Sequence, residues 1–237
     1  MAAMDDSDHG HPVHLPGLPA WRRCTVGEKR WPATVAVLGA VVLQVSLPER
    51  LSMPPRYLLP ALEVLLVIGL SVADPDRIDR RDNRLRLAGV VLTALLTLAN
   101  IGSGIRLISA LLSAHGSGGS AARLLVNGGS VYVTNVIAFA LWYWELDRGG
   151  PAARAHGLMK YPDFLFPQMT APELTPPDWE ATFIDYFYVS FTNATAFSPT
   201  DVMPLTRWAK LTMALQSTVA LSVVALVISR AINILGQ

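Results

Sequence analysis

The feature that most constrains this chain is a series of long apolar segments that contain almost no charge. Each has at least 16 residues, and the five are 32–47, 57–73, 85–113, 130–146 and 211–229. A helix rises about 1.5 Å per residue and the hydrocarbon core of a bilayer is roughly 30 Å thick, so segments of this kind can cross it. With 51% hydrophobic and 16% charged residues, a soluble or disordered chain is disfavoured. The sequence predicts an all-α membrane protein with about five transmembrane helices in a lipid bilayer.

The chain divides into three predicted regions. Residues 1–31 form a flexible N-terminal tail, residues 32–129 a three-span helical region, and residues 130–237 a second helical region. A connection over 149–180 contains six prolines and several aromatic residues, which predicts an irregular segment along the membrane interface. The segment 142–148 (WYWELDR) is expected to form an interfacial aromatic belt at the end of the fourth span.

Lysine and arginine are distributed so as to indicate a cytoplasmic N-terminus in the cell (inner) membrane. With five spans and an inner N-terminus, fourteen of these residues lie inside and four outside. If residues 181–197 also cross the membrane, six spans result and thirteen basic residues lie inside. The two counts are nearly equal, so charge alone leaves both topologies open.

Ionisable and amide side chains within the spans carry the next predictions. Glu63 in the second span and Arg106 in the third lie at about the same depth, roughly 9 Å below one membrane face, if the two helices are antiparallel. We expect an intramembrane ion pair that locks two helices, with a proton or ion relay as the alternative. Four amide residues are expected to form interhelical hydrogen bonds: Gln44, Asn100, Asn135 and Gln216.

Residues 181–197 are aromatic and moderately apolar, yet they contain Asp185 and Asn193 and run into a turn at Pro199. A central aspartate costs about 2.5 to 3.5 kcal/mol on membrane-insertion scales, which disfavours a full span. A re-entrant helix that enters the membrane and returns fits better, because protein or a water-filled cavity can surround the irregular backbone there.

The order of elements in this half resembles the pore module of tetrameric potassium channels. An aromatic helix, a Thr-containing turn ending in Asp, the step DVMP, the stretch LTRWAK and a long uncharged helix follow one another. The likeness covers roughly 130–235, its specific part is 183–210, and it implies an outer helix, a pore helix, a filter and an inner helix. Laid on that family's T-V-G-Y-G-D, this chain has Ala196, Phe197, Ser198, Pro199, Thr200 and Asp201, and the filter-like turn comprises these residues together with Thr195 before them.

Nearly the full length of the chain also resembles an uncharacterised family of small bacterial integral membrane proteins. The shared pattern is four spans, a loop, an aromatic re-entrant-looking helix with a polar turn, and a final helix. This second resemblance implies a membrane location and little about activity.

The filter-like turn lacks the glycines of the potassium-channel filter. Glycines there let successive carbonyl groups face the ion, and Ser198 and Thr200 stand in their places. Pro199 further fixes its φ near −65°. A potassium-selective filter of that family's kind is therefore not expected, and a side-chain-lined or wider pore is left open as the alternative, with Thr195, Ser198, Thr200 and Asp201 as candidate liners.

The last span carries a stripe of small and polar residues at four-residue spacing. Ala214, Thr218 and Ser222 lie on one face of that predicted helix. Small residues at this interval let helices approach closely, so helix packing is the first interpretation and pore lining the alternative.

Several classes of function are disfavoured. No nucleophile with its base, no phosphate-binding glycine loop and no metal-ligand cluster is recognisable, so we expect no enzyme, no catalytic residues, no metal and no cofactor. The net charge of +1 disfavours nucleic-acid binding. The most concrete prediction is a homo-oligomeric ion channel, tetrameric if it follows the pore modules, for monovalent cations. A non-conducting scaffold or partner subunit is the main alternative, and a small transporter using Glu63, Arg106 and Asp185 a weaker one.

Overall fold

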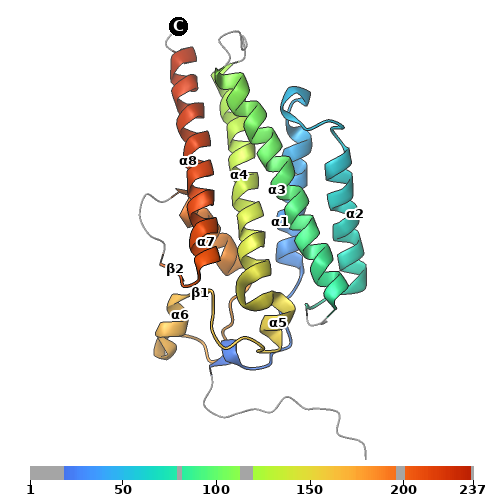
Figure 1. Ribbon diagram of the computed structural model, residues 1–237, viewed down its shortest axis with the longest axis vertical. Coiled ribbons are helices and arrows are strands. Elements are labelled where there is room, and N and C mark those ends of the chain that lie inside the picture. Colours follow the sequence, from blue (N-terminus) through green and yellow to red (C-terminus); the bar gives the residue numbers. More distant parts are fainter. Residues whose placement is uncertain (1–18, 79–81, 113–119, 196–200, 236–237) are drawn as a thin grey trace, which may run out of the picture.

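The structure, a computed structural model, describes residues 19–78, 82–112, 120–195 and 201–235. Within these residues the five apolar segments are helices that run side by side along the long axis of the molecule (Figure 1). They are α1 (Trp31–Ser46), α2 (Leu58–Ala73), α3 (Asn83–Leu112), α4 (Ala121–Leu146) and α8 (Arg207–Leu235). The protein is therefore a helical bundle, as the apolar segments predict.

Three of these helices are long and apolar enough to cross a membrane, by length and composition. They comprise residues Asn83–Leu111, Ala121–Gly149 and Arg207–Ile234. The other two, α1 and α2, have 16 residues each and so rise only about 24 Å. The prediction of a helical membrane protein is thus confirmed in outline, while the count of five crossings stays a prediction.

Helix α4 is the centre of the bundle and contacts α1, α3, α7 and α8. Its apolar stretch is 61% buried, against 44% for α3 and 28% for α8. It begins where the Ser120 hydroxyl accepts a hydrogen bond from the Arg123 backbone N–H. At Gly128 a Cβ would lie 2.7 Å from a Val227 methyl carbon, so glycine permits the close approach of α8. The predicted boundary at 129/130 therefore lies inside a continuous helix.

One end of the bundle is covered by the connection 147–182, and we call it the capped end (Figure 1). Helices α1, α3 and α8 begin there, and α2 and α4 end there. The connection contains short elements only: η3 (Asp147–Gly149), α5 (Pro151–Ala155), β1 (Phe164–Leu165), α6 (Pro167–Thr170) and η4 (Pro172–Leu174). Strand β1 pairs antiparallel with β2 (Met203–Pro204), just before α8.

The aromatic residues of this connection are divided between core and surface. Phe164 and Phe166 are 0% and 2% exposed, and Phe164 packs against Tyr186 and Trp208. The expectation that the whole connection lies along the interface is therefore wrong for these two rings. They bury more apolar area against α7 (Phe183–Thr195) and α8 than a surface position allows. Tyr161, in contrast, is exposed.

Residues 19–30, which belong to the predicted flexible tail, are held against the capped end. The Thr25 N–H donates to the Ala155 carbonyl at 2.7 Å, and the Ile78 N–H donates to the Glu28 carbonyl at 3.0 Å. The tail therefore contributes side chains to the interior of the capped end, a result that its composition did not indicate.

Candidate functional site

The most distinctive local arrangement is a short helix, α7, packed between α4 and α8. With 13 residues it rises about 20 Å, whereas α8 has 29 residues. Both α7 and α8 begin at the capped end, since the Phe183 N–H donates to Glu28 and the Trp208 indole N–H donates to Asp163. Helix α7 therefore runs away from the capped end, and α8 starts from that same end (Figure 1).

The start of α7 is fixed by its own first turn. The Asp185 carboxylate accepts hydrogen bonds from the Thr182 backbone N–H at 2.7 Å and from the Thr182 hydroxyl at 2.9 Å. This is a capping arrangement, and a negative charge is favoured at a helix N-terminus. Asp185 thus lies at the beginning of the helix and not at the centre of a span, which removes the insertion cost expected for a central aspartate.

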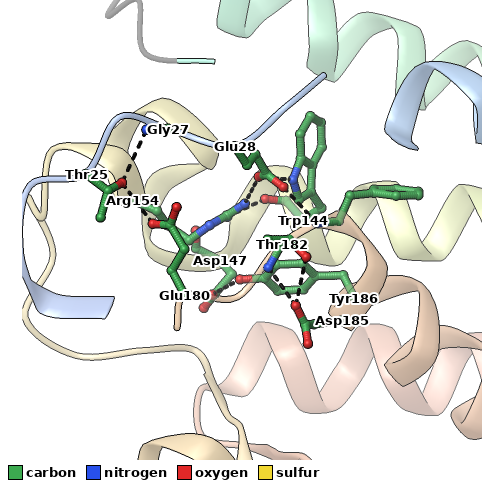
Figure 2. Close-up of polar contacts among 11 residues, drawn as sticks. Thr25, Gly27, Glu28, Trp144, Asp147, Arg154, Glu180, Thr182, Asp185 and Tyr186 are labelled. Carbon is green, nitrogen blue, oxygen red and sulfur yellow. Dashed lines mark hydrogen bonds and ion pairs between the residues drawn. The ribbon is translucent and has the colours of Figure 1, made fainter. Parts of the chain in front are cut away.

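A buried ion pair between Glu28 and Arg154 joins the N-terminal segment to α5 (Figure 2). The Glu28 carboxylate accepts hydrogen bonds from the Trp144 indole N–H, from Arg154 at 3.2 Å and from the Phe183 backbone N–H at 2.8 Å. The Arg154 guanidinium also donates to the carbonyls of Trp144 and Asp147. Every one of these groups is partnered, as buried charges require.

Burial and pairing act in opposite directions on this ion pair. Burial raises the pKa of the Glu28 carboxyl above its ordinary value of 4.5, while the Arg154 guanidinium and the hydrogen bonds from Trp144 and Phe183 oppose that rise. The pKa of Arg154 is raised, since burial, which lowers it, is outweighed by the negative groups around it. The guanidinium therefore remains charged at any physiological pH.

Asp147, at the end of α4, joins three elements of the module. Its carboxylate accepts hydrogen bonds from the Tyr186 hydroxyl on α7 and from the Asp163 and Phe164 backbone N–H groups beside β1. The residue is fully buried. The segment 142–148, predicted as a surface belt, is largely internal, because Trp144 and Asp147 face the polar groups of the capped end. Tyr143 is likewise fully buried.

A second polar layer lies farther along α8, around Gln216. Its amide donates to the Ser190 hydroxyl at 2.6 Å, and its carbonyl accepts from the Tyr143 hydroxyl at 2.6 Å and from Asn193 at 2.8 Å. The Ser190 hydroxyl in turn donates to the Val136 carbonyl on α4. The predicted interhelical hydrogen bonding of Gln216 is confirmed, and this layer fixes the register of α4, α7 and α8.

The filter-like turn is described only at its two ends. Thr195 is the last residue of α7 and is exposed, and its hydroxyl donates to the Phe191 carbonyl. Asp201 is exposed just before β2. Residues Ala196, Phe197, Ser198, Pro199 and Thr200 lie outside the described residues, so their predicted part in a pore stays a prediction.

The stripe on α8 faces outward from the chain. Ala214, Thr218 and Ser222 are exposed, while Met213, Gln216, Ala220 and Val223 on the other face are buried. The two hydroxyls donate to backbone carbonyls four residues earlier, at Ala214 and Thr218. Within a single chain the stripe therefore does not mediate helix packing, and it is free to face lipid, a pore or another subunit.

Glu63 has a different partner from the predicted one. It is fully buried, and its carboxylate accepts hydrogen bonds from the Gln44 amide on α1 at 3.1 and 3.4 Å. In the described part of the chain no ion pair joins it to Arg106, which is half-buried on α3. Equal depth in the membrane did not decide the pairing, because Glu63 projects toward α1. The interhelical role predicted for Gln44 is confirmed.

Comparison of the chain with models of protein families, with curated proteins and with solved structures finds no match. The two resemblances therefore stay predictions that rest on the residues quoted for them.

Proposed function

We propose that the protein forms a homo-oligomeric pore in the membrane, in which α4 is the outer helix, α7 the pore helix and α8 the inner helix. The observation that carries this proposal is the placement of α7. It is a half-length helix held between two long antiparallel helices, and it begins at the same end as the helix that follows it. In a pore module a helix of this kind leads into the pore loop, and here the filter-like turn follows α7 directly in sequence.

The exposed side of α8 supports assembly with further copies. One copy of the module cannot enclose a pathway, so α8 needs neighbours of its own kind. Its apolar stretch is the least buried of the three long helices, at 28%. The outward stripe of Ala214, Thr218 and Ser222 offers the small and hydroxyl side chains that suit a close helix contact or a hydrated wall.

Charge suggests cations as the permeant species, with modest selectivity. Asp201 is exposed at the end of the filter-like turn and carries a negative charge toward the mouth of the proposed pathway. The turn lacks the glycines that would aim backbone carbonyls at a dehydrated potassium ion. We therefore expect conduction of hydrated monovalent cations through a pore lined by side chains.

The positive-inside bias supports a cytoplasmic position for the capped end. Basic residues gather there on residues 19–30, at Arg77, Arg84 and Arg86, and in the connection 147–182 (Figure 1). In this topology the loop enters the membrane from the cytoplasmic side of the cell membrane.

The deciding experiment combines assembly with ion flux. Native mass spectrometry of the protein in nanodiscs should give a tetramer or another closed ring, and liposomes containing the protein should pass potassium and sodium. Asp201→Asn should lower cation flux about tenfold, since an acidic mouth concentrates cations. Asp178→Asn is the matched control, because Asp178 is an exposed acid at the same end, and it should leave flux unchanged. A stable monomer, or flux indifferent to Asp201, contradicts the proposal.

The apolar surface of the capped end favours a second candidate, a non-conducting scaffold. Leu158, Met159, Tyr161 and Leu174 are between 48% and 83% exposed. Such side chains can bind a partner protein or lie in the membrane interface. If the protein is such a scaffold, it should fold without forming oligomers, and liposomes that contain it should pass no ions.

A further inference from the structure

A cavity of about 910 Å³ lies at the capped end, on the side of α4 opposite to α7. It is enclosed by the start of α1, the end of α2, the start of α3, the end of α4 and residues 149–153. Its place at the helix ends puts it at the level of the lipid head groups if the bundle spans the bilayer. The volume is sufficient for a head group and part of its glycerol backbone.

The inner wall of this cavity carries a buried carboxylate with no direct partner. Glu145 is 6% exposed and lines the cavity, and in the described residues no donor forms a hydrogen bond or ion pair with it. Of the guanidinium groups whose charge acts on it, those of Arg154 and Arg30 are bonded to Glu28 and to Asp74, and Arg86 is exposed at the rim. Because Glu145 lines the cavity, a hydrogen-bond donor for its carboxylate can come from a ligand that occupies the cavity.

The opposite wall makes room for this carboxylate. At Gly89 on α3 a Cβ would lie 2.4 Å from the Glu145 Oε1 atom, closer than any side chain tolerates. Glycine is therefore required at this position for Glu145 to adopt its orientation. The carboxylate is positioned by the packing of two helices and not by hydrogen bonds of its own.

The charges around the cavity cancel. Asp74 pairs with Arg30 at 3.2 Å, and Asp82 accepts a hydrogen bond from the Arg84 backbone N–H. The guanidinium groups of Arg84 and Arg86 are exposed at the rim. Three basic and three acidic residues line the cavity: Arg30, Arg84, Arg86, Asp74, Asp82 and Glu145. A ligand that carries one positive and one negative group matches this wall better than a simple anion or cation does.

We infer that the cavity binds a phosphoethanolamine group, with its ammonium on Glu145 and its phosphate on Arg84 and Arg86. An ammonium supplies the hydrogen-bond donors that the Glu145 carboxylate lacks, and arginine forks suit phosphate oxygens. The deeper wall is apolar and formed by Val37, Val67, Leu70, Leu92 and Leu141. In phosphatidylethanolamine the glycerol and acyl chains follow the phosphate, so they would leave the cavity at its rim, and the same head-group chemistry is also found in a free solute.

The test measures lipid binding to the detergent-solubilised full chain by native mass spectrometry. Phosphatidylethanolamine should bind about tenfold more tightly than phosphatidylglycerol, which has no ammonium, and than phosphatidylcholine, whose ammonium cannot donate hydrogen bonds. Glu145→Gln should abolish this preference, and Gly89→Ala should weaken it by displacing the carboxylate. Glu173→Gln, at an exposed acid of the capped end, is the matched control and should retain it.

Soluble phosphoethanolamine distinguishes the two sources of the ligand. If it competes with the lipid at a similar concentration, the head group alone is recognised. If it competes only at much higher concentration, the acyl chains contribute and the ligand is a lipid. Equal binding of phosphatidylglycerol, or an undiminished preference in Glu145→Gln, overturns the inference. Both results are independent of whether the protein conducts ions.

Discussion

Two buried carboxyl groups lie on opposite sides of the end of α4, and they are satisfied very differently. Glu28, on the side of α7, accepts hydrogen bonds from Trp144, Arg154 and Phe183. Glu145, on the side of α3, lines a cavity and accepts none from the described residues. The buried polar groups around Glu28 serve as hydrogen-bond partners for one another, whereas the Glu145 carboxylate is left available to a ligand in the cavity.

The difference arises from what packs against each side of α4. Three separate elements converge on Glu28: the end of α4 through Trp144, α5 through Arg154 and the start of α7 through Phe183 (Figure 2). The Glu145 carboxylate lies beside Gly89 and Gly150, two residues without a side chain, and lines the cavity. Variants on the two sides of α4 test this difference.

Removing the cation from the matched side should produce the largest loss of stability. In Arg154→Met the Glu28 carboxylate loses its buried counter-charge, which should cost about 3–5 kcal/mol in the free energy of unfolding. Thermal unfolding in detergent, followed by tryptophan fluorescence, measures the loss. Lys160→Met, at an exposed lysine of the same end, should change the free energy of unfolding by less than about 0.5 kcal/mol. Equal losses in the two variants would show that the buried ion pair does not stabilise the fold more than an exposed side chain does.

The hydrogen bonds around Gln216 test whether other buried polar groups beside α7 also stabilise the fold. Gln216→Ala leaves the Tyr143 and Ser190 hydroxyls and the Asn193 amide short of a partner, which should cost about 1–3 kcal/mol. Ser222→Ala, on the outward face of the same helix, should be nearly neutral in a monomer. Hydrogen exchange of α7 should rise in the first variant alone; an unchanged α7 would mean that the layer does not hold it.

The pH dependence of stability gives a smaller effect with a defined sign. Burial raises the pKa of Glu28 in the folded state above the unfolded value of 4.5, so the folded state binds this proton more tightly. Its contribution to stability is therefore full below pH 4.5 and declines as the pH rises through the folded pKa, by about 1.4 kcal/mol per unit of separation. Glu28→Gln should remove this decline. A wild-type melting temperature that instead rises across that window relative to the variant contradicts the assignment.

The helices and the short α7 could be predicted from sequence because their signals are local. Apolar length indicated the long helices, and the aromatic segment 181–197 indicated a further helix, which the structure places at Phe183–Thr195. That this helix is re-entrant stays a prediction. The amide pattern likewise predicted the interhelical bonds of Gln44 and Gln216.

The polar clusters could not be predicted, because their members are distant in sequence. Glu28 and Arg154 are separated by 126 positions, and nothing in a proline-rich tail marks a glutamate as internal. The segment 142–148 has the composition of an interfacial belt, yet the packing of α5 and α7 buries Trp144 and Asp147. The predicted ion pair between Glu63 and Arg106 was wrong for a related reason. The depth of a residue in the membrane follows from its position in the sequence. Which neighbouring helix its side chain faces depends on how the helices are arranged, and the sequence does not give that arrangement.

The smallest change in the free energy of unfolding is expected for Glu145, on the cavity side of α4. Glu28→Gln should lower the free energy of unfolding by about 1–3 kcal/mol, because the amide group cannot accept the hydrogen bonds that both carboxylate oxygens accept from Trp144, Arg154 and Phe183. Glu145→Gln removes a buried charge that forms no hydrogen bond with the described residues, and so should leave the free energy of unfolding within about 0.5 kcal/mol of wild type or raise it. Two isosteric changes beside one helix end would then differ by about 1–3 kcal/mol in the free energy of unfolding, while only the second alters lipid preference. If Glu145→Gln proves as destabilising as Glu28→Gln, Glu145 is a structural residue, and its side of α4 is as closed as the other.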